Sequence, residues 1–180
     1  MATFKPRLNQ AGMLGSRYWY TTTNPFYPDY GLPNCTCYAW GRFWEISDPL
    51  KTGENIPHLP TGNAKTWYNS VSGYNKGQTP KLGAILCLGA NVGVGHVAIV
   101  EQILENNVII TSNSAWNGQY FYTQILTPDT NGKYHTQGSQ STYESQGFIY
   151  NPFVNDDPEP TTKKDNFPWV LYAHKLRNPL

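Results

Sequence analysis

The first strong hydrophobic pattern along the chain begins at Cys35 and has the spacing of a helix. Four positions recur at intervals close to 3.6 residues and so share one helix face: Cys35, Ala39, Phe43 and Ile46. Asn34 precedes them and can cap the helix N-terminus with its side chain. Asp48-Pro49 ends the pattern, because the residue before a proline avoids helical dihedrals. The sequence therefore predicts a helix that starts at Cys35.

The pattern changes to strands after Lys81. Short apolar or alternating runs cover residues 83–88, 96–104, 107–114, 118–126 and 146–152. Glu105 and Asn106 separate the second run from the third, which predicts an antiparallel hairpin. A short second helix is predicted at 63–68, and a polar loop at 127–145. One helix followed by antiparallel strands indicates an α+β fold with the helix packed on the sheet.

The domain organisation follows from where these patterns start and stop. We expect residues 1–30, rich in Tyr, Pro and Asn, to form an irregular N-terminal arm over the core. Residues 31–153 contain the helix and the strands, and form the predicted main domain. Residues 154–180 begin with the polar stretch VNDDPEPTTKKDN and are predicted to be a linker and a C-terminal extension. Within the extension, FPWVLYAHKL reads as a final strand or the start of a further element.

Composition changes this picture only in excluding some partners. Charged residues make up 14% of the 180 residues and the formal net charge is +1, so nothing favours a nucleic acid or an anionic membrane. The longest apolar runs are too short to span a bilayer, and the start MATFKPRLNQ contains no apolar signal core. Low charge with many Tyr and Trp residues suits a protein that works outside cells on a polar polymer.

The three cysteines raise the question of chemistry, because an odd number does not form a disulfide framework. Metal ligand, disulfide partner, buried residue and nucleophile are the alternatives. Cys35 would sit in the first helical turn, where the helix dipole lowers a thiol pKa. Cys37 would lie about 200° further round the helix, so the two thiols cannot both face one partner. We expect Cys37 and Cys87 to be buried, and leave a disulfide between them open.

A nucleophilic thiol needs a base, and His96 has the most favourable setting of the four histidines. It opens a predicted strand directly after a Gly-Val-Gly turn, so a rigid element would fix its imidazole. Pairing about the hairpin turn puts Asn113 on the same sheet face, where it could orient the imidazole. Ser112 or Ser114 could substitute in another register. Glu101 falls on the opposite face and is predicted to be a surface charge.

Six segments in order resemble the CHAP family of cysteine- and histidine-dependent amidohydrolases and peptidases: NCTCYAWGRFWEI, GNAKTWY, GAILCL, GHVAIVEQI, TSNSAWNG and QGFIYNP. The resemblance runs from about residue 31 to 152. It implies a papain-like fold and cleavage of peptidoglycan, with Cys35 as nucleophile and His96 as its base. Asn113 stands where the family often has Glu or Asp. The acidic calcium loop of some members has no counterpart before Cys35, so no metal or other cofactor is expected.

The resemblance leads to a hypothesis for a Cys-His-Asn hydrolase. Asn34 would contribute to the oxyanion site, Tyr38 would lie near it, and Trp116 would line the substrate cleft. The enzyme would be phage-encoded, an endolysin or tail-associated protein, and would act extracellularly or from the virion on Gram-positive peptidoglycan, with other tail or lysin domains as partners. The bond would be that of an N-acetylmuramoyl-L-alanine amidase or an endopeptidase. A non-catalytic wall-binding module and a metal site of the three cysteines with a histidine are the competing hypotheses.

Overall fold

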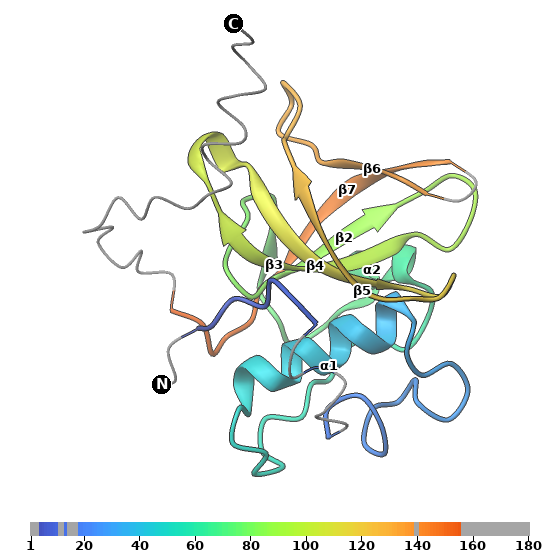
Figure 1. Ribbon diagram of the computed structural model, residues 1–180. Coiled ribbons are helices and arrows are strands. Elements are labelled where there is room, and N and C mark those ends of the chain that lie inside the picture. The colour runs from blue at the N-terminus through green and yellow to red at the C-terminus, as the bar shows by residue number, and fades with distance from the viewer. Residues whose placement is uncertain (1–3, 11–12, 14–17, 139–140, 156–180) are drawn as a thin grey trace, which may run out of the picture.

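A helix lies against an antiparallel sheet in the computed structural model, which describes residues 4–10, 13, 18–138 and 141–155. Helix α1 (Cys35–Ser47) runs below strands β3, β4 and β5 in Figure 1. The strands are β1 (Lys76–Gly77), β2 (Ile85–Gly89), β3 (His96–Ile103), β4 (Ile109–Ala115), β5 (Gln119–Leu126), β6 (His135–Gln137) and β7 (Thr142–Ile149). Their order is β1-β7-β2-β3-β4-β5, and β6 pairs with β7. This confirms the predicted α+β class.

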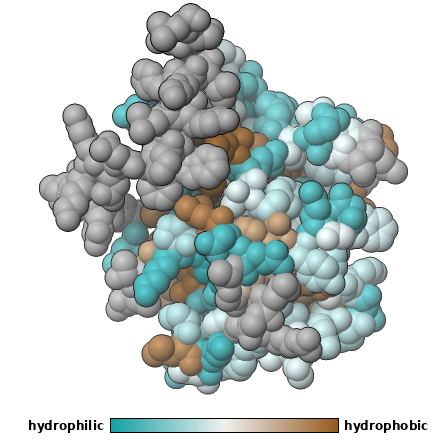
Figure 2. Space-filling model, viewed as in Figure 1, coloured by the Kyte–Doolittle hydropathy of each residue, from teal (hydrophilic) through white to brown (hydrophobic). Residues whose placement is uncertain are grey.

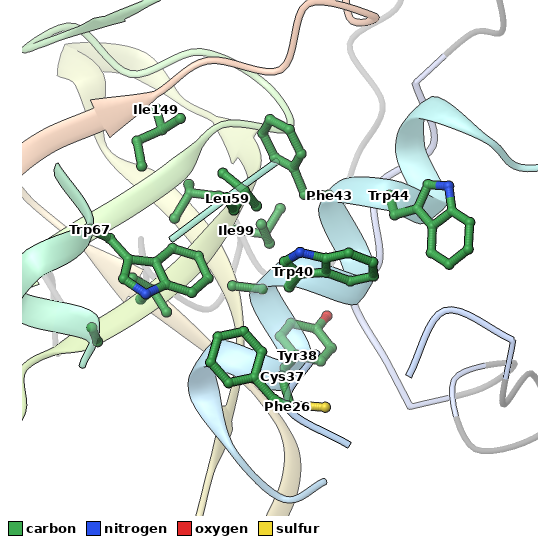
Figure 3. Close-up of a cluster of buried hydrophobic side chains, with 14 of the residues drawn as sticks. Phe26, Cys37, Tyr38, Trp40, Phe43, Trp44, Leu59, Trp67, Ile99 and Ile149 are labelled. Carbon is green, nitrogen blue, oxygen red and sulfur yellow. The ribbon is translucent and has the colours of Figure 1, made fainter. Parts of the chain in front are cut away.

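Helix α1 begins and ends where the sequence predicts, but it is buried more completely. Asn34 is its N-cap and Asp48 its C-cap. All residues of 36–44 are buried, rather than one face only. Figure 3 shows Trp40 and Phe43 of α1 close to Ile99. The helix is therefore a central core element with protein on every side, and not a surface helix with a solvated face.

The second cover of α1 comes from the segment before it. Residues 18–30 form turns without a helix or strand, yet Trp19, Tyr20 and Phe26 are buried in the same core as the helix. Gly41 is the point of closest approach, since a Cβ there would lie 2.6 Å from the Trp19 carbonyl oxygen and 2.5 Å from the Tyr20 ring. This part of the N-terminal arm shares the core of the residues that follow.

The sheet separates two apolar clusters. Ile85, Cys87, Val97 and Ile99 pack with α1, while Leu86, Leu88, Val100 and Phe148 belong to the cluster that also contains Tyr134 and Tyr143. Strands β2 and β3 form the middle of the sheet, and the residues 85–88 and 96–101 are buried throughout. A strand buried on both faces makes a rigid support for whatever its first residue carries.

The predicted strands are present, with differences at the C-terminal side of the sheet. The hairpin forms about the short 3-10 turn η2 (Glu105–Asn107), whose Asn106 and Asn107 have positive φ. The predicted helix at 63–68 is the 3-10 turn η1 (Ala64–Thr66) followed by α2 (Trp67–Ser70). The predicted loop 127–145 is wrong in part, because β6 and the first half of β7 lie in it. The predicted strand or further element at FPWVLYAHKL lies outside the described residues.

On the face seen in Figure 2, hydrophobic residues are interspersed among polar ones. Within the described ranges, none of the helices combines the length and apolar character needed to cross a bilayer.

Candidate active site

The cap of α1 fixes the position of Cys35. Asn34 has extended dihedrals (φ −163°, ψ 137°), and its Oδ1 accepts hydrogen bonds from the amides of Thr36 at 2.9 Å and Cys37 at 3.2 Å. The Thr36 hydroxyl donates to the same oxygen at 2.6 Å. Cys35 is thereby held as the first residue of the helix, where unpaired amides and the helix dipole favour a negative charge.

His96 is held by the turn that precedes it. It is the first residue of β3 and is 9% exposed. Gly95 adopts a φ of +77°, and a Cβ at Gly95 would lie 2.6 Å from the Leu88 carbonyl oxygen. Only glycine tolerates both the dihedral and the close approach. The glycine turn predicted from the sequence therefore brings the imidazole to a defined place at the end of the strand.

Asn113 holds the imidazole from the neighbouring strand. Its Oδ1 lies 3.0 Å from His96 Nε2. Its Nδ2 donates to the Thr111 carbonyl oxygen at 3.2 Å and to Thr111 Oγ1 at 3.0 Å. A carbonyl can only accept, so the amide group must face Thr111 and Oδ1 must face His96. His96 then carries its proton on Nε2, which leaves Nδ1 toward Cys35.

Cys35 and His96 form a hydrogen-bonded pair with opposed pKa shifts. Burial raises the pKa of the Cys35 thiol, but the hydrogen bond and charge of His96 outweigh this and the pKa ends below its ordinary value. Burial lowers the pKa of His96, but Cys35 and then Asn113 raise it above its ordinary value. The backbone amides of Val97 and Thr36 also stabilise the thiolate. Opposed shifts favour a thiolate–imidazolium pair.

The other two cysteines differ from Cys35 in burial and in the direction of their pKa shifts. Burial raises the pKa of Cys37 to about 12, and it also raises the pKa of Cys87 well above the ordinary value. All three cysteines are free thiols, so Cys37 and Cys87 are not paired. Among the described residues, no group of three or more His, Cys, Asp or Glu side chains could hold a metal ion. The hypothesis of a metal site made from the cysteines therefore has no geometric support in that part of the chain.

The remaining sequence-predicted residues lie in different settings. Asn34 is half-buried, with its Oδ1 engaged in the cap. Tyr38 has no exposed surface and donates to Ser112 Oγ at 2.8 Å, so it is close in sequence to Cys35 but closed to a ligand. Trp116 is 83% exposed and follows β4 directly. Ser114 donates to the Gln119 carbonyl oxygen at 3.2 Å. Neither serine replaces Asn113 beside His96.

The prediction that Glu101 is a surface charge is wrong. Its side chain is fully buried and accepts hydrogen bonds from Arg42 Nε and Nη2, both at 3.0 Å, from Ser112 Oγ at 2.7 Å and from the Arg7 amide at 2.8 Å. Alternation correctly puts Glu101 and His96 on opposite faces of β3. The error came from taking that opposite face as solvated, whereas α1 and the N-terminal segment cover it.

Two residues near the site were not foreseen from the sequence. Thr111 receives the Asn113 amide, as described above. Tyr122 is the antiparallel partner of Asn113 in the ladder between β4 and β5. Burial and then the charge of Cys35 raise the pKa of Tyr122 to about 12, so its hydroxyl stays protonated. Thr111 could have been found by alternation from Asn113, but Tyr122 needs the register of β4 with β5.

Comparison with known proteins agrees with this geometry. The sequence model of the CHAP domain matches residues 23–115, more than half of the chain. The chain belongs to the CHAP domain family. The match contains Cys35, His96 and Asn113, and it begins within the N-terminal segment that packs on α1. Membership of the CHAP domain family supports a peptidoglycan amidohydrolase.

Two further comparisons add little to the CHAP assignment. A crystal structure of N-acetylmuramoyl-L-alanine amidase from Staphylococcus aureus is similar at 23% identity and a TM-score of 0.40. The similarity covers 64% of this chain and 30% of that one. A likeness this distant carries no argument here. Comparison with curated proteins gives no match.

Proposed function

We propose that this CHAP domain hydrolyses an amide bond of peptidoglycan with Cys35 as nucleophile, His96 as acid and base, and Asn113 as the residue that orients His96. The observation that carries the proposal is that one imidazole is hydrogen-bonded to both Cys35 and Asn113. A nucleophile hydrogen-bonded to a base, which is in turn hydrogen-bonded to an orienting group, is the arrangement found in cysteine hydrolases.

Acylation uses the thiolate–imidazolium pair directly. The Cys35 thiolate attacks the amide carbon, an Sγ–C bond forms, and the carbonyl electron pair moves to oxygen. In this proposal the Cys35 backbone amide at the start of α1 and Asn34 Nδ2 are the donors for this oxyanion. The His96 imidazolium gives its proton to the leaving nitrogen as the C–N bond breaks, and the amine departs. Asn113 Oδ1 keeps the ring oriented through both charge states.

Deacylation reverses the role of the imidazole. Neutral His96 takes a proton from water, and the hydroxide adds to the thioester carbon. The second tetrahedral intermediate collapses with loss of the Cys35 thiolate, which leaves a carboxylic acid product and the imidazolium. The pair is restored for the next cycle, so no cofactor is required by the scheme.

The finer assignments belong to the same proposal. The scissile bond is that of an N-acetylmuramoyl-L-alanine amidase or of a stem-peptide or cross-bridge endopeptidase. A phage origin, with action at the wall of a Gram-positive bacterium from outside the cell or from a virion, remains our interpretation of the family resemblance. Residues 31–153 would be the catalytic domain, 1–30 an arm and 154–180 a linker and extension. Trp116, exposed after β4, would contact the glycan or stem peptide.

Digestion of purified Gram-positive peptidoglycan tests the proposal, with wild type compared to Cys35→Ala and with Cys37→Ala as matched control. Wild type and Cys37→Ala should release fragments, and Cys35→Ala should lose at least about 10⁴-fold in rate. Mass spectrometry of the new amino termini separates the two bonds, since an amidase exposes the first alanine of the stem. Full activity in Cys35→Ala would refute the nucleophile. Wall binding without cleavage by wild type would favour the binding-module hypothesis.

A further inference from the structure

Tyr122 lies at the proposed site without a role in the scheme above. It is the Cα partner of Asn113, and paired residues in an antiparallel ladder direct their side chains to the same face. Its neighbour Phe121 points to the other face, where its ring packs edge-on against Tyr38 at a centroid distance of 6.2 Å. Tyr122 is therefore directed to the face on which Asn113 meets His96.

The hydroxyl of Tyr122 has no hydrogen bond to any residue that the structure describes, although the side chain is half-buried. Most tyrosine hydroxyls in such settings find a partner. Among the tyrosines near the site, Tyr38 donates to Ser112, and Tyr20 donates to Glu45 at 3.2 Å. Because its pKa is raised, Tyr122 keeps its proton at neutral pH and remains a donor. After burial, the charge of Cys35 is the second cause that raises the pKa of Tyr122.

The side of the scissile bond that Tyr122 faces follows from the order of the residues. The oxyanion develops near the start of α1, where the Cys35 amide points. The leaving amine must face His96, which protonates it. Asn113 lies on the far side of His96 from Cys35, and Tyr122 is paired with Asn113. Tyr122 is thus on the His96 and Asn113 side of the site, which is the side that the leaving amine must face.

We propose that Tyr122 binds substrate through its hydroxyl, which donates a hydrogen bond to the first carbonyl on the amine side of the scissile amide. This inference rests on the proposed function. It holds for either candidate bond, because the leaving amine is an amino-acid residue with its own carbonyl in both. Tyr122 would then contribute to specificity for the leaving group, whereas Cys35, His96 and Asn113 carry out the hydrolysis.

The test compares wild type, Tyr122→Phe and the control Tyr120→Phe on two substrates. Tyr120 lies on the same strand and is 44% exposed. One substrate is a purified muropeptide, and the other is N-acetylalanine p-nitrophenyl ester, whose leaving group has no carbonyl beside the broken bond. Tyr122→Phe should lower kcat/KM on the muropeptide about fivefold to tenfold, the usual effect of one lost hydrogen bond. Its rate on the ester, and both rates of Tyr120→Phe, should match wild type.

Each other outcome is decisive. Unchanged rates of Tyr122→Phe on both substrates would overturn the inference. An equal loss on both substrates would also overturn it, because the hydroxyl would then act through Cys35 or His96. Wild type that does not cleave the muropeptide would overturn the proposed function and this inference with it, a result seen before any Tyr122 variant is made. Because the hydroxyl has no partner among the described residues, Tyr122→Phe should unfold at the same urea concentration as wild type.

Discussion

The two faces of strand β4 carry polar groups for opposite purposes. Asn113 joins His96 to Thr111 on one face, and its neighbour Ser112 joins Tyr38 to Glu101 on the other. Both networks are buried and closely bonded. On the first face, His96 is also hydrogen-bonded to Cys35, which sits at the start of a helix and is half-buried. On the second face every polar atom named above has a protein partner, and the ion pair to Arg42 is enclosed.

This difference teaches how to separate a reactive cluster from a structural one. Burial and hydrogen bonding do not distinguish them, because both networks have these features. What distinguishes them is whether the charged group has all its hydrogen bonds and ion pairs within the protein or keeps its charge for a reaction with substrate. In the proposed mechanism the thiolate of the stabilised Cys35–His96 pair attacks a carbonyl, whereas the Glu101 carboxylate accepts four hydrogen bonds from the protein itself.

Removal of His96 should have the largest effect on the rate, and this effect should not extend to the Glu101 network on the second face. His96→Ala should lower kcat about 10³-fold or more, because the leaving amine loses its acid and water its base. It should also raise the pKa of Cys35, so the pH profile of iodoacetamide alkylation moves to higher pH. His135→Ala is the matched control, since the exposed His135 side chain pairs with the surface residue Asp129. An unchanged alkylation profile in His96→Ala would show that the histidine does not stabilise the thiolate.

Removing the Glu101 network on the second face should reduce the free energy of unfolding and leave the catalytic rate of the folded protein unchanged. Glu101→Ala removes the fully buried carboxylate from Arg42, which keeps Glu45 as its other ion-pair partner at 3.1 Å. Loss of one partner of a buried ion pair costs about 3–5 kcal/mol in free energy of unfolding, and we expect the lower end of that range because Glu45 remains. Urea unfolding measures this, with the exposed Glu105→Ala as control. A loss of kcat in protein shown to be folded by circular dichroism would contradict the separation of the two faces.

Asn113→Ala should change the pH dependence as well as the rate. The hydrogen bond from His96 to Asn113 raises the pKa of His96, so its removal lowers that pKa. The active ion pair exists above the lowered pKa of Cys35 and below the raised pKa of His96. The alkaline limb of the kcat/KM profile should therefore move to lower pH, while kcat falls about 10–100-fold for one bond to a charged group. An alkaline limb that stays in place would show that Asn113 does not raise the pKa of His96.

Thr111→Val should give the smallest effect and should sharpen the assignment of Asn113. Valine keeps the shape but removes the hydroxyl that receives Asn113 Nδ2, while the backbone acceptor of Thr111 remains. We expect kcat to fall about fivefold, the effect of roughly 1 kcal/mol, with a small shift of the alkaline limb in the same direction as for Asn113→Ala. Thr111→Ser should restore both. A loss of stability alone, without a shift in the pH profile, would make Thr111 a purely structural residue.

Local features of the sequence were enough for the parts of the site that depend on one element or one hairpin. The Asn34 cap fixes where α1 begins, the Gly95 turn fixes His96, and alternation within the hairpin brings Asn113 to His96. Each depends on residues close in sequence or on a single antiparallel pairing.

The sequence did not predict features that depend on which segments pack over a given face of the sheet or helix. The environment of Glu101 requires knowing that α1 and the Arg7 region pack over its face. The burial of 36–44 on every side of α1 requires that Trp19 and Tyr20 pack against the helix. The β-structure in 127–145 has a polar sequence, because β6 (His135–Gln137) lies at the margin of the sheet and only half of β7 is covered. Tyr122 needed the register of a further pair of strands.

The contrast among the three thiols allows the fraction of correctly folded protein in a preparation to be measured by thiol titration. His96 holds the pKa of Cys35 below its ordinary value, while burial raises the pKa of Cys37 and of Cys87. An excess of an electrophile at neutral pH would modify one thiol per folded chain and then stop. The amount bound counts competent molecules in a preparation, so specific activities can be expressed per functional nucleophile and not per milligram. Misfolded chains would reveal themselves by taking up more than one equivalent.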